Sequence, residues 1–184
     1  MIDIPYINAQ GLESRATKKF KRVMAYLQEH KLDGGRKGGN MRLFVFNPKK
    51  GNTDEPAQID AFPLGVMPLR DRWRYEMNSA EKAARLANCW RMGNRYCSSW
   101  CTRNPDMPLP SIKQWGGAIV VTLPPGIVGP KKRFAILSFS GLPEDADEVL
   151  CLLVAQAMGW EVETKTVLLS GNKLARAFFD LVLS

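Results

Sequence analysis

Near the start of the chain, apolar residues recur every three or four positions between Ser14 and about Lys31, with lysine and arginine between them. This spacing predicts an amphipathic helix with one face in a core. The residues on that face are Phe20, Val23, Met24 and Leu27. Ser14 suits the N-cap, and Asp33-Gly34-Gly35 suits the end of the helix. The segment from Gly34 to Asn40 then has the composition of a flexible, basic loop.

Four short apolar runs have the length and composition of strands. Met41 to Phe46 and Gln58 to Leu64 flank a turn at Lys49 to Asn52, which predicts an antiparallel hairpin. Ala118 to Leu123 and Phe134 to Phe139 flank a loop rich in proline and glycine, which predicts a second hairpin. The unbroken apolar run of the last strand indicates that it is central and buried.

A second helix is predicted from Ser79 to about Met92. Its apolar face consists of Ala83, Leu86, Ala87 and Trp90, and its charged residues Glu81, Lys82, Arg85 and Arg91 fall mainly on another face. Prolines at 105, 108 and 110 exclude regular structure from the connection that follows.

A third helix is predicted after the turn Ser140 to Pro143, and it ends at Gly159. Its first turn carries Glu144, Asp145, Asp147 and Glu148, which we interpret as acids that favour the helix dipole and solubility. Asn172 to Leu183 again has helical spacing, with Leu174, Ala177, Phe178 and Leu181 on one side. This tail is expected to dock on the body or on another subunit.

These elements predict one compact α/β (α+β) domain of 184 residues. Residues 1–40 supply the first helix and a basic loop, 41–159 the strands and two helices, and 160–184 the helical tail. The longest apolar runs are far shorter than the ~20 residues of a membrane span. The N-terminus lacks the basic and apolar regions of a targeting signal, so a cytoplasmic location is expected.

The formal net charge is +8, with basic clusters at 15–22, 36–50, 70–74 and 131–133. A polyanionic partner is therefore one of the alternatives to consider. Nucleic-acid binding is considered but not favoured, because the clusters are scattered and no nucleic-acid-binding motif accompanies them. Four cysteines are few for a chain of this length, which favours free thiols over a disulfide framework.

The residues offer little for catalysis. His30 is the one histidine and lies among polar neighbours, so a histidine triad or a site with several histidines lacks its parts, and we interpret it as an exposed surface residue. Cys97 and Cys101 are spaced more widely than a zinc knuckle. No catalytic residue and no metal site is assigned.

Three segments are candidates for ligand binding. The segment Trp90 to Tyr96 is aromatic and basic, and it either stacks on a planar ligand or, as we favour, packs in the core. Gly116-Gly117 forms a tight turn or allows the close approach of another backbone or a ligand. The turn at Ser140-Gly141 either directs helix N–H groups at an anion or only bridges to the helix start.

The segment from Phe134 to Glu148, with the turn Ser140-Gly141-Leu142-Pro143, resembles the hallmark strand, turn and helix of the heme-degrading domain family (GlcG/HbpS-like). Gly116-Gly117 before a strand and Trp73 after Gly65 to Pro68 are similar to further segments of that family. Trp115 and Glu148 stand where its cytosolic branch often has histidines. The resemblance implies a profilin-like antiparallel sheet flanked by helices, assembly as a dimer or larger homo-oligomer, and in some relatives heme binding.

The sequence thus leaves three hypotheses. The first is a non-enzymatic module that binds heme or another planar ligand, in an oligomer, near Trp90, Tyr96, Gly116, Gly117, Ser140 and Gly141. The second is an interaction protein, a subunit of a larger protein assembly, whose contact surface is the basic clusters or the tail. The third is nucleic-acid binding through the basic surface.

Overall fold

A four-stranded antiparallel sheet forms the centre of the protein. The computed structural model describes residues 9–46, 58–93, 98–99, 116–126, 132–162, 172–175 and 178. Within them the strand order is β2-β1-β4-β3. The strands are β1 (Gly38–Val45), β2 (Gln58–Gly65), β3 (Ala118–Leu123) and β4 (Arg133–Ser140). Both predicted hairpins are confirmed, and they join where β1 pairs antiparallel with β4.

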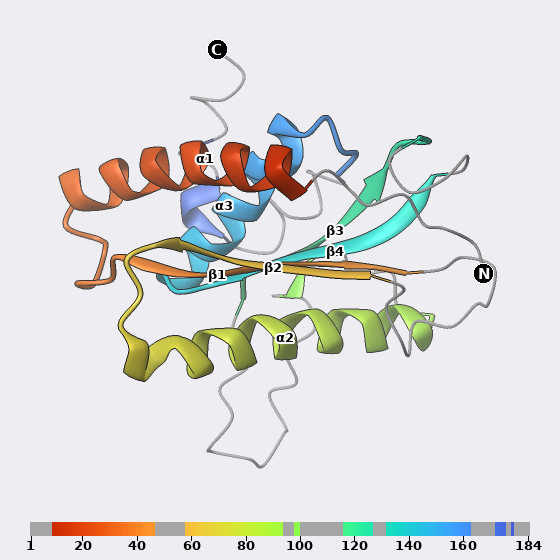
Figure 1. The fold of residues 1–184 in the computed structure, drawn as a ribbon, viewed down its shortest axis with the longest axis horizontal. Coiled ribbons are helices and arrows are strands. Elements are labelled where there is room, and N and C mark those ends of the chain that lie inside the picture. Colours follow the sequence, from red (N-terminus) through yellow and green to blue (C-terminus); the bar gives the residue numbers. More distant parts are fainter. Residues whose placement is uncertain are drawn as a thin grey trace.

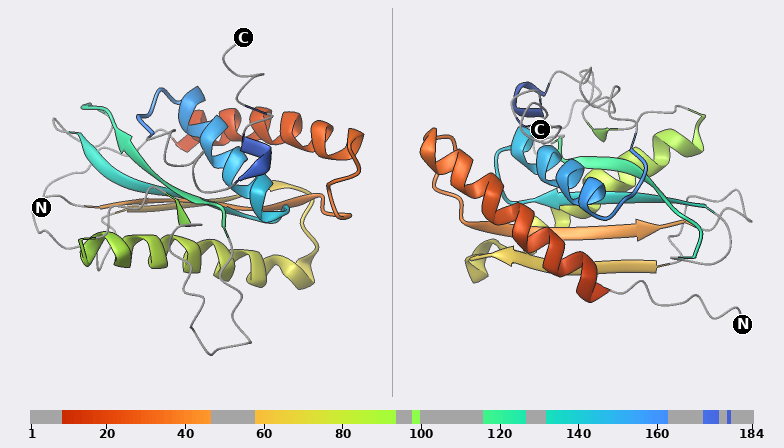
Figure 2. Two further views of the ribbon diagram at one scale, coloured as in Figure 1. Left: turned by 180° about the vertical axis from the view of Figure 1, so that it is seen from behind. Right: turned by 90° about the horizontal axis from the view of Figure 1, so that it is seen from above.

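Helices cover both faces of this sheet. Helices α1 (Ala9–Glu29) and α3 (Glu144–Ala157) lie on one face, and α2 (Leu69–Arg91) lies on the other (Figure 1). The view from above shows α1 and α3 side by side over the strands (Figure 2). An α+β fold with an antiparallel sheet flanked by helices, as predicted, is confirmed.

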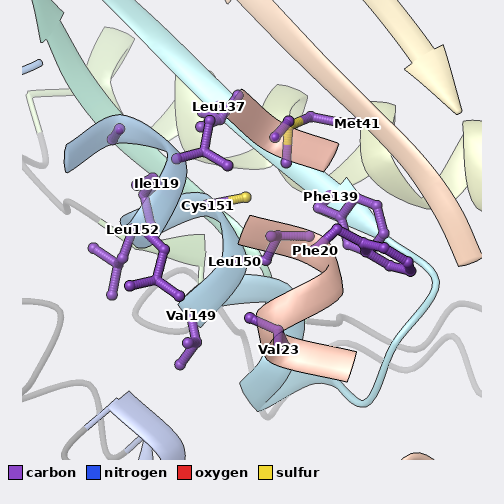
Figure 3. Close-up of a cluster of buried hydrophobic side chains, with 14 of the residues drawn as sticks. Phe20, Val23, Met41, Ile119, Leu137, Phe139, Val149, Leu150, Cys151 and Leu152 are labelled. Carbon is purple, nitrogen blue, oxygen red and sulfur yellow. The ribbon is translucent and has the colours of Figure 1, made fainter. Parts of the chain in front are cut away.

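Strands β1, β3 and β4 supply side chains to two cores, because successive residues point to opposite faces of a sheet. On β4, Leu137 belongs to the large core under α1 and α3, and Ile136 belongs to the smaller core over α2. Side chains from α1, α3 and all four strands belong to the large core, part of which is drawn in Figure 3. Its members include all four apolar residues on which the first helix was predicted.

Helix α1 begins earlier than predicted. Ser14 is not the N-cap, because the helix already includes Ala9, and Ser14 is exposed in its second turn. The loop predicted from Gly34 to Asn40 is also too long, since β1 begins at Gly38.

Helix α2 begins ten residues before the predicted start at Ser79. Leu69, Trp73 and Met77 recur at four-residue spacing, a helical signal that the prediction did not use, and the structure leaves all three exposed. Ion pairs along the helix stabilise the turns instead, between Arg74 and Asp71 and between Arg72 and Glu76.

The end of α3 and part of the tail agree with the predictions. Gly159 follows α3 with a φ of 70°, a conformation that favours glycine. In the tail, Phe178 is buried, and its ring lies 4.6 Å from that of Tyr26 on α1, so this part docks on the body. Leu181 and the turn at 49–52 lie outside the described residues. None of the described helices is both long and apolar enough to cross a membrane.

Candidate functional site

A buried ion pair connects the helices on opposite faces of the sheet. Lys82 Nζ on α2 lies 2.7 Å from Asp147 Oδ2 on α3, and the two side chains are only 1% and 3% exposed. The neighbours of Lys82 on α2, such as Leu86, belong to the smaller core, whereas Leu150 on α3 belongs to the large one. The pair therefore joins the two layers past the edge of the sheet.

Gly117, directly before β3, leaves the space for this contact. Its φ is 108°, and a Cβ added there would lie 2.5 Å from Asp147 Cβ and 3.0 Å from Lys82 Nζ. The sequence predicted that a backbone or a ligand approaches the glycine pair closely. In the structure, the two side chains of the ion pair fill this place.

Backbone groups complete the hydrogen bonding of the ion pair. Lys82 Nζ donates to the Phe139 carbonyl at 2.8 Å, and the Leu142 N–H donates to Asp147 Oδ1 at 2.8 Å. Both carboxylate oxygens thus accept a hydrogen bond, as a buried charge requires. The turn that was a candidate for holding an anion holds the chain's own Asp147.

Burial dominates the electrostatics of Asp147. It raises the pKa of this carboxyl from its usual 3.8 to about 6, against the opposing effects of Lys82, the Leu142 N–H and Arg36. One turn further along α3, Cys151 Sγ donates to the Gly117 carbonyl at 3.6 Å. Burial, followed by the nearby charge of Asp147, raises the pKa of the Cys151 thiol well above its usual value, so this thiol stays protonated.

Glu148, the next residue on α3, forms a second buried polar group. Its Oε1 accepts a hydrogen bond from Ser98 Oγ, and its Oε2 accepts one from Asn172 Nδ2 at 2.7 Å. Asn172 Nδ2 also donates to the Asp145 carbonyl at 3.0 Å. Glu148 therefore fastens two distant segments of the chain to the start of α3.

These contacts correct three predictions. Lys82 was placed on the charged face of its helix, and Asp147 and Glu148 were interpreted as dipole and solubility features, but all three are buried. The sequence carried a signal for two of them. Lys82 precedes the buried Leu86 by four positions and Asp147 precedes the buried Leu150 by three, so each lies on the apolar stripe of its helix.

The structure brings together four of the six residues predicted to bind a ligand. Gly116, Gly117, Ser140 and Gly141 meet at one end of the β3–β4 hairpin, where the Gly116 N–H donates to Glu144 Oε2 at 3.1 Å. Trp90 instead stacks on Phe134, with ring centroids 4.5 Å apart, at the other end of β4. Ser140 follows Phe134 by six positions along the strand, which corresponds to roughly 20 Å. The favoured interpretation of Trp90, packing in the core, is confirmed, and Tyr96 lies outside the described residues.

The described residues contain no cluster of three or more histidine, cysteine or acidic side chains suited to a metal ion. His30 is exposed, as predicted, and its ring stacks on Tyr26 at 4.1 Å. Cys97 and Cys101 lie outside the described part of the chain.

An exposed apolar row on α2 forms a second candidate site. Leu69, Trp73 and Met77 follow one another at four-residue spacing and are 86%, 61% and 61% exposed. We call this row the α2 stripe. Trp73 precedes Lys82 by nine residues, about two and a half turns, so it lies on the opposite side of α2 from the ion pair at β3.

The side of α2 that carries the stripe is the side nearer β2. Helix α2 packs against β1, β3 and β4. On β2, Phe62 and Leu64 are buried in the core under α1, whereas Ala61 and Pro63, which point to the α2 side, are exposed. The α2 stripe therefore borders a part of the sheet that no described helix covers.

Comparison with known proteins does not assign the chain. No family model, no curated protein and no solved structure matches it. The resemblance to the heme-degrading domain family stays a prediction.

Proposed function

We propose that this chain is a non-enzymatic interaction subunit that binds a helix of another protein along the α2 stripe. The observation that carries this proposal is the exposure of three large apolar side chains in one row on a single helix. Isolated apolar residues are common on protein surfaces, but a contiguous apolar patch marks an interaction site.

The size of the stripe suits a helix of a partner. Three residues at four-residue spacing extend over about 12 Å, which is two turns of a facing helix. Tryptophan and methionine are enriched at interfaces, and tryptophan is among the residues that contribute most to binding. Burying the exposed part of Trp73, on the order of 100 Å², contributes about 2.5 kcal/mol.

The charges around the stripe favour a partner with acidic residues beside its apolar face. Arg70 and Arg74 border the stripe and have side chains that are 88% and 55% exposed. A second copy of this chain brings the same arginines and its own charge of +8, which opposes association. The occupant we propose is therefore an acidic amphipathic helix.

Binding of a defined peptide tests the proposal. An 18-residue helical peptide with leucine at positions i, i+4 and i+8 and glutamate beside them is titrated with the full chain by fluorescence anisotropy. A peptide with the same leucines and lysine in place of glutamate measures the charge preference. We expect the acidic peptide to bind saturably and Trp73→Ala to weaken it roughly 30-fold, or about 2 kcal/mol.

Leu32→Ala provides the matched control, because Leu32 is also a large exposed apolar residue, 45% exposed, and lies just beyond α1. It should leave peptide binding unchanged. Equal binding by wild type and Trp73→Ala contradicts the proposal. A concentration-dependent dimer that Trp73→Glu abolishes makes a second copy the occupant instead, and it also contradicts the acidic-helix assignment.

Ligand binding at the glycine turns is the competing proposal. Its support is the sequence resemblance, which includes Gly116-Gly117 and the turn at Ser140-Gly141. A planar ligand at that place would have to displace the Lys82–Asp147 pair, at the cost of leaving charges buried and unpaired. Titration with hemin distinguishes the two proposals: a saturable Soret shift that is lost in a Ser140 or Gly141 variant favours the ligand, and a featureless spectrum disfavours it.

A further inference from the structure

Arg42 is a cation at the boundary between α2 and the uncovered face of β2. On β1 it stands opposite Ala61 of β2, and residues paired in this way point to the same face of a sheet. Phe44, two positions further along β1, belongs to the smaller core over α2, so Arg42 also points to the α2 side. Ala61 is exposed on that side. The Arg42 side chain therefore lies beside a surface that a partner can reach.

The guanidinium of Arg42 is held in place from within the protein. Its Nε donates to Asn40 Oδ1 at 3.1 Å, and Asn40 is only 4% exposed. The same Oδ1 lies 3.4 Å from the Oγ of Ser79, a buried residue of α2. A cation that a buried neighbour already orients loses little conformational entropy when it binds an anion. Arg42 is therefore preorganised for binding.

The charge of Arg42 is incompletely paired among the described residues. Only 21% of its side chain is exposed, and its ion pair, between Nη2 and Glu76 Oε2, has a separation of 3.8 Å. This distance is too long for a hydrogen bond. The other oxygen of Glu76 accepts from Arg72 Nε at 2.9 Å, so one carboxylate serves two arginines. A partly buried cation in this state carries a desolvation cost that a further carboxylate would offset.

We infer that Arg42 binds one carboxylate of the partner helix and so determines where an acidic residue must stand in that helix. The inference rests on the proposed binding of a helix along the α2 stripe. Glu76 lies three residues after Trp73 and directly before Met77, so the acid that Arg42 faces borders the stripe. The planar fork of a guanidinium matches a carboxylate in geometry as well as in charge. Arg42 is thus the residue of the site that sets the position of the bound helix.

The arginines that border the stripe on α2 itself are less suited to this role. The Arg70 and Arg74 side chains are 88% and 55% exposed, and both pair with Asp71. Charges so exposed are screened by solvent, and each contributes little to a specific geometry. A fixed donor that is mostly shielded from water forms a stronger hydrogen bond to a carboxylate. We therefore expect Arg70 and Arg74 to attract acids at many positions, and Arg42 to select one.

A glutamate scan of the helical peptide tests the inference on the full chain. The parent peptide has the same leucines at i, i+4 and i+8 and glutamine at every flanking position. Each variant carries a single glutamate at one of those positions. Anisotropy titrations of the wild type should find one position, or two that are one turn apart, at which glutamate tightens binding about 10-fold. Arg42→Gln should abolish this preference and bind the parent peptide within about 2-fold of the wild type.

Two further variants separate the geometry of Arg42 from its charge. Lys18→Gln removes one charge from an exposed residue of α1, across the sheet, and should keep the full preference (Figure 1). Arg42→Lys keeps the charge but lacks the fork, so its preference should fall to about 3-fold or less. It also supplies the test if thermal melts show that Arg42→Gln is unfolded.

The outcomes distinguish this inference from the proposed function. Equal tightening by glutamate at every position of the peptide overturns the role of Arg42 but leaves helix binding intact. So does an undiminished preference in either Arg42 variant. A wild type that binds none of the peptides contradicts the proposed function, and the inference fails with it.

Discussion

Removing one partner of the Lys82–Asp147 pair should destabilise the protein more than removing both. In Lys82→Met, Asp147 is left at 2% exposure without a counter-charge, although the Leu142 N–H still donates to it. In Asp147→Asn, the ammonium of Lys82 is left buried with the Phe139 carbonyl as its neutral acceptor. Breaking a buried pair in this way lowers the free energy of unfolding by about 3–5 kcal/mol. The double variant buries no charge, so its loss of unfolding free energy should be smaller than the sum of the losses in the two single variants.

The cost of Lys82→Met should also depend on pH. In the wild type the pKa of Asp147 is raised to about 6, so the folded state binds a proton that the unfolded state releases between pH 3.8 and 6. The stability that this group contributes is therefore greatest below pH 3.8. It falls as the pH rises to 6, and above that it levels off. Without Lys82 the pKa rises further, so the fall continues above pH 6 by up to about 1.4 kcal/mol per pH unit.

Urea unfolding of all four proteins of the cycle at pH 6, 7 and 8 measures both effects. We expect a coupling energy of at least about 2 kcal/mol at pH 8. The Lys132–Glu161 pair is the matched control, because its atoms are 2.6 Å apart but its side chains are 58% and 64% exposed. Its coupling should be at most about 1 kcal/mol. Equal coupling in both cycles, or a Lys82→Met cost independent of pH, would refute the reasoning.

Three further predictions concern the surroundings of this pair. Gly117→Ala should lower the free energy of unfolding by more than about 3 kcal/mol, because its Cβ meets Asp147, whereas Gly159→Ala, with positive φ but open space, should lose only about 1 kcal/mol in the same urea assay. Cys151 should react with iodoacetamide at least about 100-fold more slowly than the partly exposed Cys89, as read by peptide mass spectrometry, and equal rates contradict its burial. Asn172→Ala should release the tail, since its side chain bonds Glu148 and the Asp145 carbonyl, and hydrogen exchange at the Ala175 amide should then accelerate.

The elements that the sequence predicted are those whose pattern is local. Both hairpins combine short apolar runs with nearby turn residues, and α1 shows a full apolar face. The residues that determine each of these elements therefore lie within about 25 positions of one another. The end of α3 at Gly159 is equally local, because a single residue with positive φ sets it.

The ion pair was missed because its two members are 65 residues apart in the sequence. A single lysine or aspartate is most often exposed, and only the partner justifies its burial. The position of Lys82 on an apolar stripe was visible, but nothing in the chain identified Asp147 rather than another acid as its partner. The same holds for Glu148, whose partners Ser98 and Asn172 come from distant segments.

The two parts of α2 together connect the buried pair to the proposed function. The second half of the helix packs on the sheet, and Lys82 fixes its rotation, because its ammonium must reach Asp147 past Gly117. Residues 69–78, at the start of the helix, supply no buried side chain, yet they belong to the same rigid helix. The rotation that brings Lys82 to the edge at β3 therefore directs Trp73 to the opposite side, toward the uncovered face of β2. An exposed row that a buried charge holds in one orientation is preorganised for a partner, which reduces the entropy lost on binding.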